Sequence, residues 1–148
     1  MIRSTSMRSL LALSLLALAG CATYHDELVR GEQAYEKNDH ERALATFRAL
    51  EANQSHFDVT EEARYTYLRG MTDYRIGYRA DARHWLMIAK AIDDQNKDAL
   101  PPDWRNRLVT ALTELNHAVF AGGISALSND DKKPQKEPPT QAKPVEEE

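Results

Sequence analysis

Apolar residues recur with the period of an α-helix from residue 24 to residue 92 and again from residue 103 to residue 120. The clearest apolar face lies mid-chain and consists of Ala63, Tyr67, Gly70, Met71, Tyr74 and Tyr78. Such spacing predicts amphipathic helices that pack on a common core. Residues 93–102 are polar and end in two prolines, so we expect a loop there. The pattern predicts an all-α fold.

The ends of the predicted helices carry recognisable signals. Thr60 is a candidate N-cap, and Glu61 and Glu62 suit the positive end of a helix dipole. Gly77 tolerates the left-handed conformation that ends many helices. Asn38 is the next best residue for that conformation. These signals predict a helix-turn-helix around residue 38 and another around residue 77.

Three further apolar stripes complete the predicted helices. The stripe after the first turn consists of Ala43, Leu44, Phe47 and Leu50. The stripe after the second turn consists of Ala82, Trp85, Leu86, Ala89 and Ile92. The last stripe consists of Trp104, Leu108, Ala111, Leu112, Leu115, Ala118 and Val119, and it ends before a Gly122-Gly123 pair. We expect this last helix to close the apolar face left by the first four.

The first two helix pairs repeat in sequence. Leu28-Val29-Arg30-Gly31, Tyr35, Asn38, Ala43 and Phe47 match Tyr67-Leu68-Arg69-Gly70, Tyr74, Gly77, Ala82 and Leu86 at a constant separation of 39 residues. A period of this length is typical of stacked supersecondary units. Two such units rarely make a stable stack alone, so the fifth helix is expected to act as a cap.

The spacing of small and large residues in each unit resembles the tetratricopeptide repeat. Gly31, Ala43 and Phe47 stand at the family's spacing, and the three residues 39 positions later do so too. The family's early Trp is missing from both units, and residues 53–58 lengthen the linker. The resemblance implies two helix-turn-helix units over residues 26–92 and a peptide groove lined by the first helix of each unit. A plain antiparallel helical bundle is the alternative architecture.

Tyrosines and arginines are the candidate partner-binding residues. The helix pattern assigns Tyr67, Tyr74 and Tyr78 to the core, because they share a stripe with Met71. The expected binding candidates are Arg30, Tyr35, Tyr65, Arg69, Arg75 and Arg79, of which Tyr65, Arg75 and Arg79 are expected to be the more exposed. Tyrosine and arginine are enriched at binding hot spots.

The N-terminus has the pattern of a secretory signal. Arg3 and Arg8 precede a run from Leu10 to Leu18 that is too short to span a bilayer. Leu18-Ala19-Gly20-Cys21 then resembles the lipobox of bacterial lipoproteins. The resemblance implies removal of residues 1–20 and a covalent diacylglycerol and N-acyl chain on Cys21. Ala22 in place of Asp implies the outer membrane, facing the periplasm. An ordinary signal peptide with a chance Cys is the alternative.

Composition narrows the remaining possibilities. The net charge is −4, and it becomes −6 after removal of residues 1–20, which argues against nucleic acid as a partner. Cys21 is the single cysteine, so no intramolecular disulfide is possible. Residues 123–148 are rich in Pro, Lys and Glu and are expected to be disordered. Residues 21–25 form a short lipidated linker, and residues 26–122 form the helical domain.

The residue pattern does not favour enzymatic chemistry. The five histidines lack helical zinc spacing, and the chain has neither a phosphate-binding glycine loop nor a nucleophile elbow. We therefore expect no catalytic residue, no metal site and no cofactor beyond the acyl chains. The leading hypothesis is a membrane-anchored, non-enzymatic scaffold that binds another envelope protein.

Two alternative functions stay open at this point. One is a lipid or small-molecule carrier with an internal cavity facing Tyr67, Met71, Tyr74 and Trp104. The other is a peptidoglycan-associated spacer that binds through the tail.

Overall fold

The computed structural model describes residues 24–128, and throughout this range the fold is helical and contains no strand. The first helix covers residues 24–36. It is followed by α2 (His40–Leu50), a 3₁₀ helix η1 (Glu51–His56), α3 (Val59–Ile76), α4 (Arg79–Gln95), α5 (Pro102–Gly122) and a second 3₁₀ helix η2 (Ile124–Leu127). The predicted all-α fold is confirmed. The signal, Cys21 and residues 129–148 lie outside the described residues. Two predicted boundaries are corrected: the first helix begins at residue 24, inside the expected linker, and residues 124–127 of the expected disordered tail form η2, which buries Leu127.

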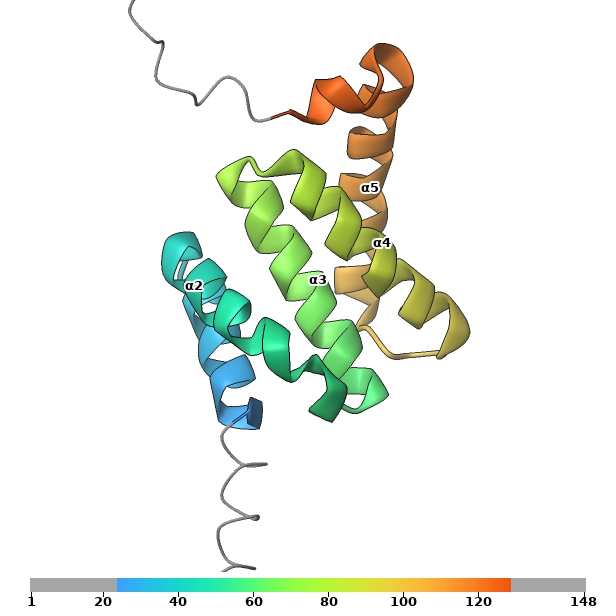
Figure 1. The fold of residues 1–148 in the computed structure, drawn as a ribbon. Coiled ribbons are helices and arrows are strands. Elements are labelled where there is room, and N and C mark those ends of the chain that lie inside the picture. Colours follow the sequence, from blue (N-terminus) through green and yellow to red (C-terminus); the bar gives the residue numbers. More distant parts are fainter. Residues whose placement is uncertain (1–23, 129–148) are drawn as a thin grey trace, which may run out of the picture.

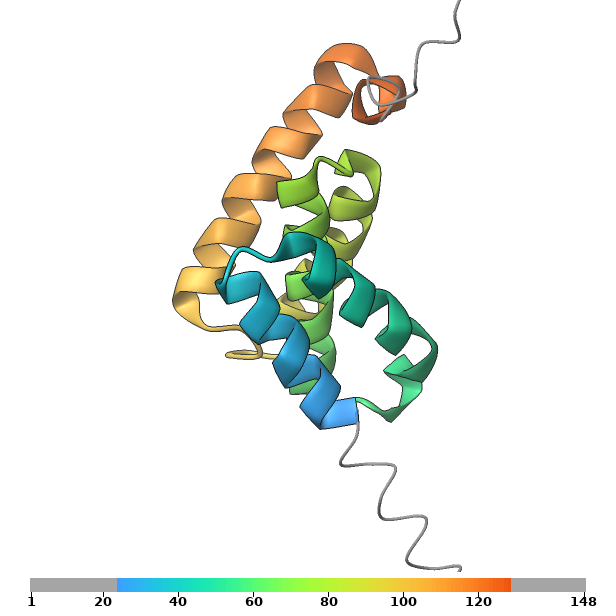
Figure 2. The same cartoon turned by 90° about the vertical axis from the view of Figure 1, so that its left-hand side faces the viewer.

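The helices form two antiparallel pairs and a fifth helix (Figure 1). The first helix pairs with α2, and α3 pairs with α4, as the 39-residue repeat predicts. Helix α5 packs against both α3 and α4 and buries Leu108, Ala111, Leu112 and Leu115, which confirms its capping role. Figure 2 shows α5 along the left-hand side, α2 toward the right, and the first helix in front between them. Helix α3 contacts α2, α4 and α5 and therefore lies centrally.

Equivalent glycines allow the two helix pairs to approach closely. A Cβ added at Gly31 would lie 2.5 Å from the Phe47 ring. A Cβ added at Gly70 would lie 2.7 Å from Leu86 Cγ and 2.9 Å from the Leu86 backbone nitrogen. Real Cβ atoms do not approach other atoms this closely. The repeated Gly and large apolar residue are thus in direct contact in each unit.

The predicted helix ends are confirmed at the two turns and corrected at the start of α3. Asn38 has a φ of 60° and Gly77 a φ of 96°, both left-handed as expected. The N-cap of α3 is Asp58, not Thr60: its carboxylate accepts from the backbone N–H of Thr60 and Glu61, and the Glu61 side chain accepts from the Asp58 N–H. This reciprocal capping box satisfies more backbone donors than a threonine cap at residue 60.

The linker between the two units is ordered. Residues 51–58, where the longer repeat places its extra residues, include η1. At one end of η1, the His56 ring stacks on Tyr24 with centroids 5.3 Å apart. Nearby, Nδ1 of His25 lies 3.0 Å from a carboxylate oxygen of Glu61. These contacts fix the start of the first helix against the second unit.

The loop before α5 is shorter than predicted and is held by one carboxylate. Helix α4 continues to Gln95, so the loop covers residues 96–101. Asp93 accepts two hydrogen bonds from the Arg105 guanidinium, at 2.6 and 2.9 Å, and one from the Leu100 N–H. Arg105 also donates to the Leu100 carbonyl. The hydrogen bonds from Arg105 hold the pKa of Asp93 below its usual range.

Candidate functional site

Tyr65, predicted to be an exposed binding residue, is buried. Its side chain is 0% exposed and packs edge-on against Phe47 and Trp85. Its hydroxyl donates to the Phe47 carbonyl at 3.0 Å, and burial raises the pKa of Tyr65 to about 12. The prediction was wrong because α3 is covered by neighbours on more than one face. Tyr65 therefore joins the core.

Arg69 is also withdrawn from solvent. It is 4% exposed, and its Nε donates to Asp73 at 2.9 Å. Its Nη1 donates to Glu51 at 3.2 Å, and its guanidinium lies over the Trp85 ring at 5.3 Å. The Arg69 guanidinium is thus engaged by Asp73, Glu51 and Trp85 within the domain. Arg69 therefore has a structural role and is not exposed for partner binding.

The other predicted site residues lie at or near the surface but on different parts of it. Arg30 is exposed and donates to Glu27. Tyr35 is half-buried beside His40, with ring centroids 5.6 Å apart. Arg75 is exposed, and Arg79 is partly buried and lies 3.9 Å from a Glu114 oxygen. The predicted residues therefore do not form one cluster.

The predicted tyrosine core is confirmed for Tyr67, which is 0% exposed, whereas Tyr74 and Tyr78 are only partly buried. The ring of Tyr67 stacks on Trp104 of α5 at 4.5 Å with an interplanar angle of 17°. Tyr74 donates its hydroxyl to Glu114, also on α5, and this hydrogen bond raises the pKa of Tyr74. The tyrosine face of α3 is thus the surface on which α5 packs.

Two open hollows flank this tyrosine face, on the side shared by the first helix, α3 and α5, which we call the inner face. The tryptophan hollow, of about 560 Å³, is lined by Glu32, Thr60, Arg64, Asp98, Ala99, Leu100, Pro101, Pro102 and Trp104. The arginine hollow, of about 360 Å³, is lined by Met71, Tyr74, Arg75, Asn106, Arg107, Thr110 and Ala111. Both are lined by residues of α3 and α5.

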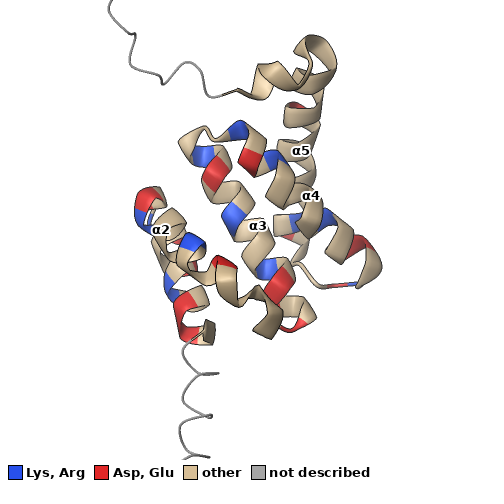
Figure 3. Cartoon of the chain, in the orientation of Figure 1, with Lys and Arg blue, Asp and Glu red and all other residues tan. Residues whose placement is uncertain are grey.

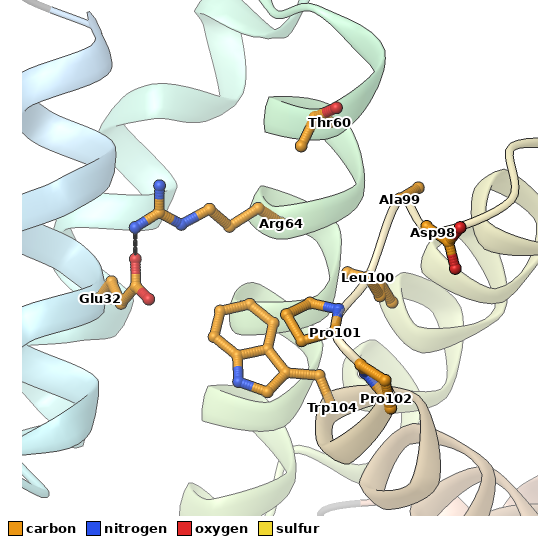
Figure 4. Close-up of a pocket in the computed structure, with 9 residues that line it drawn as sticks. All are labelled: Glu32, Thr60, Arg64, Asp98, Ala99, Leu100, Pro101, Pro102 and Trp104. Atoms are coloured by element: carbon orange, nitrogen blue, oxygen red, sulfur yellow. Dashed lines mark hydrogen bonds and ion pairs between the residues drawn. The ribbon is translucent and has the colours of Figure 1, made fainter.

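The tryptophan hollow has an apolar floor and a charged wall (Figure 4). Trp104 projects from α5 beside Pro101 and Pro102. Arg64 of α3 reaches across to Glu32 of the first helix and pairs with it. Burial lowers the pKa of Arg64 from its usual value. Arg64 and Glu32 neutralise each other, so apart from the Asp98 carboxylate the hollow offers mainly aromatic and proline surface.

The arginine hollow differs from its surroundings in charge. Figure 3 shows Lys and Arg interspersed with Asp and Glu on the same helices. Yet the described residues that line the arginine hollow include Arg75 and Arg107 and no carboxylate. Arg107 donates to Asp103 one turn away, whereas no carboxylate of the described chain lies within ion-pair distance of Arg75. Sequence periodicity gives no sign of this arrangement, because it depends on how α5 crosses α3.

Two more hollows lie away from the inner face. One is lined by α4 and η2 residues, including Met87, Ile88 and Ile124, and is mostly apolar. Ile124 and nearby Phe120 are 79% and 92% exposed. The other is lined by Arg30, Gln33, Ala34, Lys37, Asp39 and Arg42. We call it the N-terminal basic hollow; it contains one of the predicted site residues.

Residues 24–128 contain no group of three or more His, Cys, Asp or Glu side chains placed to hold a metal ion. Over the same range, every helix is too short or too polar to cross a membrane. No protein-family model, no curated protein and no solved structure matches the chain.

Proposed function

We propose that this chain is a lipid-anchored, non-enzymatic scaffold that binds another envelope protein through its inner face. The observation that carries the proposal is the pair of adjacent open hollows between α3 and α5. They combine proline with aromatic and arginine side chains, and the latter two are the types that contribute most at protein interfaces.

The tetratricopeptide-like arrangement supports a peptide-binding role. The inner face is made by the first helix, α3 and α5, which are the first helices of the two units and the capping helix. The resemblance stated for Gly31, Ala43 and Phe47 places a peptide groove on this side of each unit. Extended or helical segments are the usual occupants of open grooves of this kind.

The short N-terminal linker supports a position close to the membrane. Two residues separate Cys21 from Tyr24, where the first helix begins. At roughly 3.3–3.6 Å per residue, an acylated Cys21 holds this end of the domain within about 11 Å of its attachment point. Two or more acyl chains give stable anchoring. The domain then stands close to the bilayer and to proteins embedded there.

The packing of Tyr67 on Trp104 argues against the carrier alternative. A carrier requires an internal apolar cavity facing these side chains, whereas the two rings contact each other at 4.5 Å. The neighbouring hollows open to the surface and are partly lined by charged groups.

Crosslinking in the native envelope, followed by mass spectrometry and lipid extraction, tests the proposal. We expect a specific envelope protein to be captured above the level obtained with an unrelated lipoprotein. Copurification of a stoichiometric lipid in place of any protein would favour the carrier and contradict the scaffold.

Membrane fractionation of the Cys21→Ser variant tests the anchor separately. We expect the variant to leave the membrane fraction, because acylation requires the Cys21 thiol. Retention in the membrane without an acyl chain would contradict the anchoring.

A further inference from the structure

The arginine hollow is equipped for an anion. Arg75 and Arg107 line it together with the Asn106 amide and the Thr110 hydroxyl, and no carboxylate is among the described residues of its lining. Arg107 already donates to Asp103 one turn earlier on α5. Arg75 has no ion-pair partner within residues 24–128, so its charge is available to a ligand. Arginine binds carboxylates with two parallel hydrogen bonds.

The tryptophan hollow and the arginine hollow follow one another along α5. The lining of the two hollows on this helix runs from Pro102 to Ala111, which corresponds to about 14 Å at 1.5 Å per residue. An extended peptide rises about 3.3 Å per residue, so four or five residues cover both hollows. Trp104 and Pro101 present apolar surface at one end, and Arg75 presents charge at the other.

We propose that the inner face binds an extended segment of the partner protein, about five residues long, with an apolar side chain in the tryptophan hollow and an Asp or Glu carboxylate in the arginine hollow. This inference rests on the proposed scaffold function and specifies the chemical character of the partner segment. Charge complementarity selects an acidic segment, and the apolar floor around Trp104 excludes a free inorganic anion as the full ligand.

The N-terminal basic hollow provides a comparison within the same molecule. This hollow is lined by three cationic side chains, Arg30, Lys37 and Arg42. Unlike the arginine hollow, it includes a carboxylate, that of Asp39, and no aromatic side chain. Asp39 caps α2 through the Arg42 N–H, so its carboxylate is fixed in place. Arg42→Gln removes one positive charge, as Arg75→Gln does, but from the N-terminal basic hollow and not from the arginine hollow. It is therefore a matched control.

Selection from a random nonapeptide phage library, with the full-length detergent-solubilised protein as the target, tests the proposal. We expect the selected peptides to share an apolar residue and, three or four positions away, one or two acidic residues. The best peptide is then synthesised with a fluorescent label, and its affinity is measured by fluorescence polarisation. Peptides enriched without acidic residues would overturn the inference, even if envelope crosslinking still captures a protein.

Two variants locate the binding site. Arg75→Gln is expected to weaken peptide affinity at least tenfold, because it removes a charge-assisted hydrogen bond. Arg42→Gln is expected to change affinity less than twofold. Equal loss in Arg42→Gln and Arg75→Gln would overturn the assignment to the inner face.

The chain's own acidic stretch, Glu146 to Glu148, is tested as a competing occupant. In the full-length protein, Glu146→Gln, Glu147→Gln and Glu148→Gln are combined. We expect peptide affinity to stay within twofold of the wild type. A tenfold gain would show that this stretch already competes for the inner face, and the assignment to a partner segment would be wrong.

Discussion

Gly31 and Gly70 contact Phe47 and Leu86 at equivalent places in the two units, but the two contacts differ in kind. At Gly31 an added Cβ would meet ring atoms of Phe47, which are at the end of a side chain. At Gly70 it would also meet the Leu86 backbone nitrogen at 2.9 Å. A side chain relaxes more easily than a helix backbone. The two glycines are therefore expected to tolerate alanine unequally.

We predict that Gly70→Ala lowers the free energy of unfolding by about 1–2 kcal/mol, because overpacking outweighs the gain in helix propensity. Gly31→Ala is expected to cost less. Urea unfolding followed by circular dichroism measures both. If the Gly70→Ala variant kept the wild-type midpoint, the close contact of α3 and α4 would be contradicted.

Asp93 and Asp94 are adjacent carboxylates with different roles. Asp93 bonds the Arg105 guanidinium and the Leu100 N–H, and its side chain is largely buried. Asp94 makes an exposed pair with Lys90 four residues earlier. We predict that Asp93→Asn costs about 1–2 kcal/mol of stability, whereas Asp94→Asn costs less than about 0.5 kcal/mol. Thermal melting of both variants checks this, and similar losses would contradict the role of Asp93.

The stabilising effect of Asp93 should depend on pH in a defined direction. Arg105 holds the pKa of Asp93 below its usual range, so the folded state favours the carboxylate. This contribution is present above the unfolded pKa, about 4, and is lost as the pH falls through the folded value. The stability difference between wild type and Asp93→Asn should therefore narrow below about pH 4. A difference that stayed constant from pH 7 to pH 2 would contradict the ion pair.

At the scale of elements, α3 depends on the Asp58 capping box. Asp58 accepts from two backbone N–H groups, whereas Thr60 is exposed and serves as neither cap nor core. We predict that Asp58→Ala costs about 1 kcal/mol, in the usual range for loss of an N-cap. Thr60→Ala is the control and is expected to be close to neutral. A larger loss of stability in Thr60→Ala than in Asp58→Ala would support Thr60 as the N-cap, as predicted from the sequence.

Periodicity predicted the helices well because each stripe reflects one buried face. It placed the turns at Asn38 and Gly77, where positive φ leaves few residue types to choose from. It failed inside α3, where every residue from Tyr65 to Asp73 is buried. A central helix with several packed neighbours has no exposed face for the pattern to reveal, and the misassignment of Tyr65 and Arg69 follows from this.

The candidate site was less predictable than the helices because it depends on how elements cross. The residue pattern favoured Tyr and Arg as residue types and included Arg75, which lines the arginine hollow, whereas Tyr35 lines neither hollow. It did not single out Asn106 or Arg107, which reach the inner face only through the crossing of α5 on α3. Their spacing is that of an ordinary solvated helix face. Only the tertiary arrangement shows that no carboxylate of the described chain lines the hollow between them and Arg75.

At the scale of the whole molecule, the buried tyrosines should make the fold sensitive to alkali. Burial raises the pKa of Tyr65 to about 12 and raises that of Tyr67 as well. Their neutral forms are favoured in the folded state, so this contribution is intact below the unfolded pKa, about 10, and declines as the pH rises above it. The folded protein should resist tyrosine ionisation until it unfolds.

Absorbance at 295 nm, recorded with circular dichroism from pH 8 to pH 13, measures tyrosine ionisation and loss of helix in the same titration. We predict that Tyr65 and Tyr67 ionise only together with loss of helical signal, and that urea-unfolded protein ionises all its tyrosines near pH 10. Tyr67→Phe should remove one of the late-ionising groups. Complete ionisation near pH 10 with an intact helical signal would contradict the buried positions of these rings.

The central claim is that a protein partner binds the inner face, and site-specific photo-crosslinking in the native envelope tests it most directly. A photoreactive amino acid replaces Asn106, which lines the arginine hollow, or Val109, which is 47% exposed and lines neither hollow of the inner face. We predict a discrete protein adduct from position 106 that is absent from position 109 and is lost when Arg75→Gln is added. An adduct from position 109 alone, or one at position 106 that persists in the Arg75→Gln background, would contradict this claim.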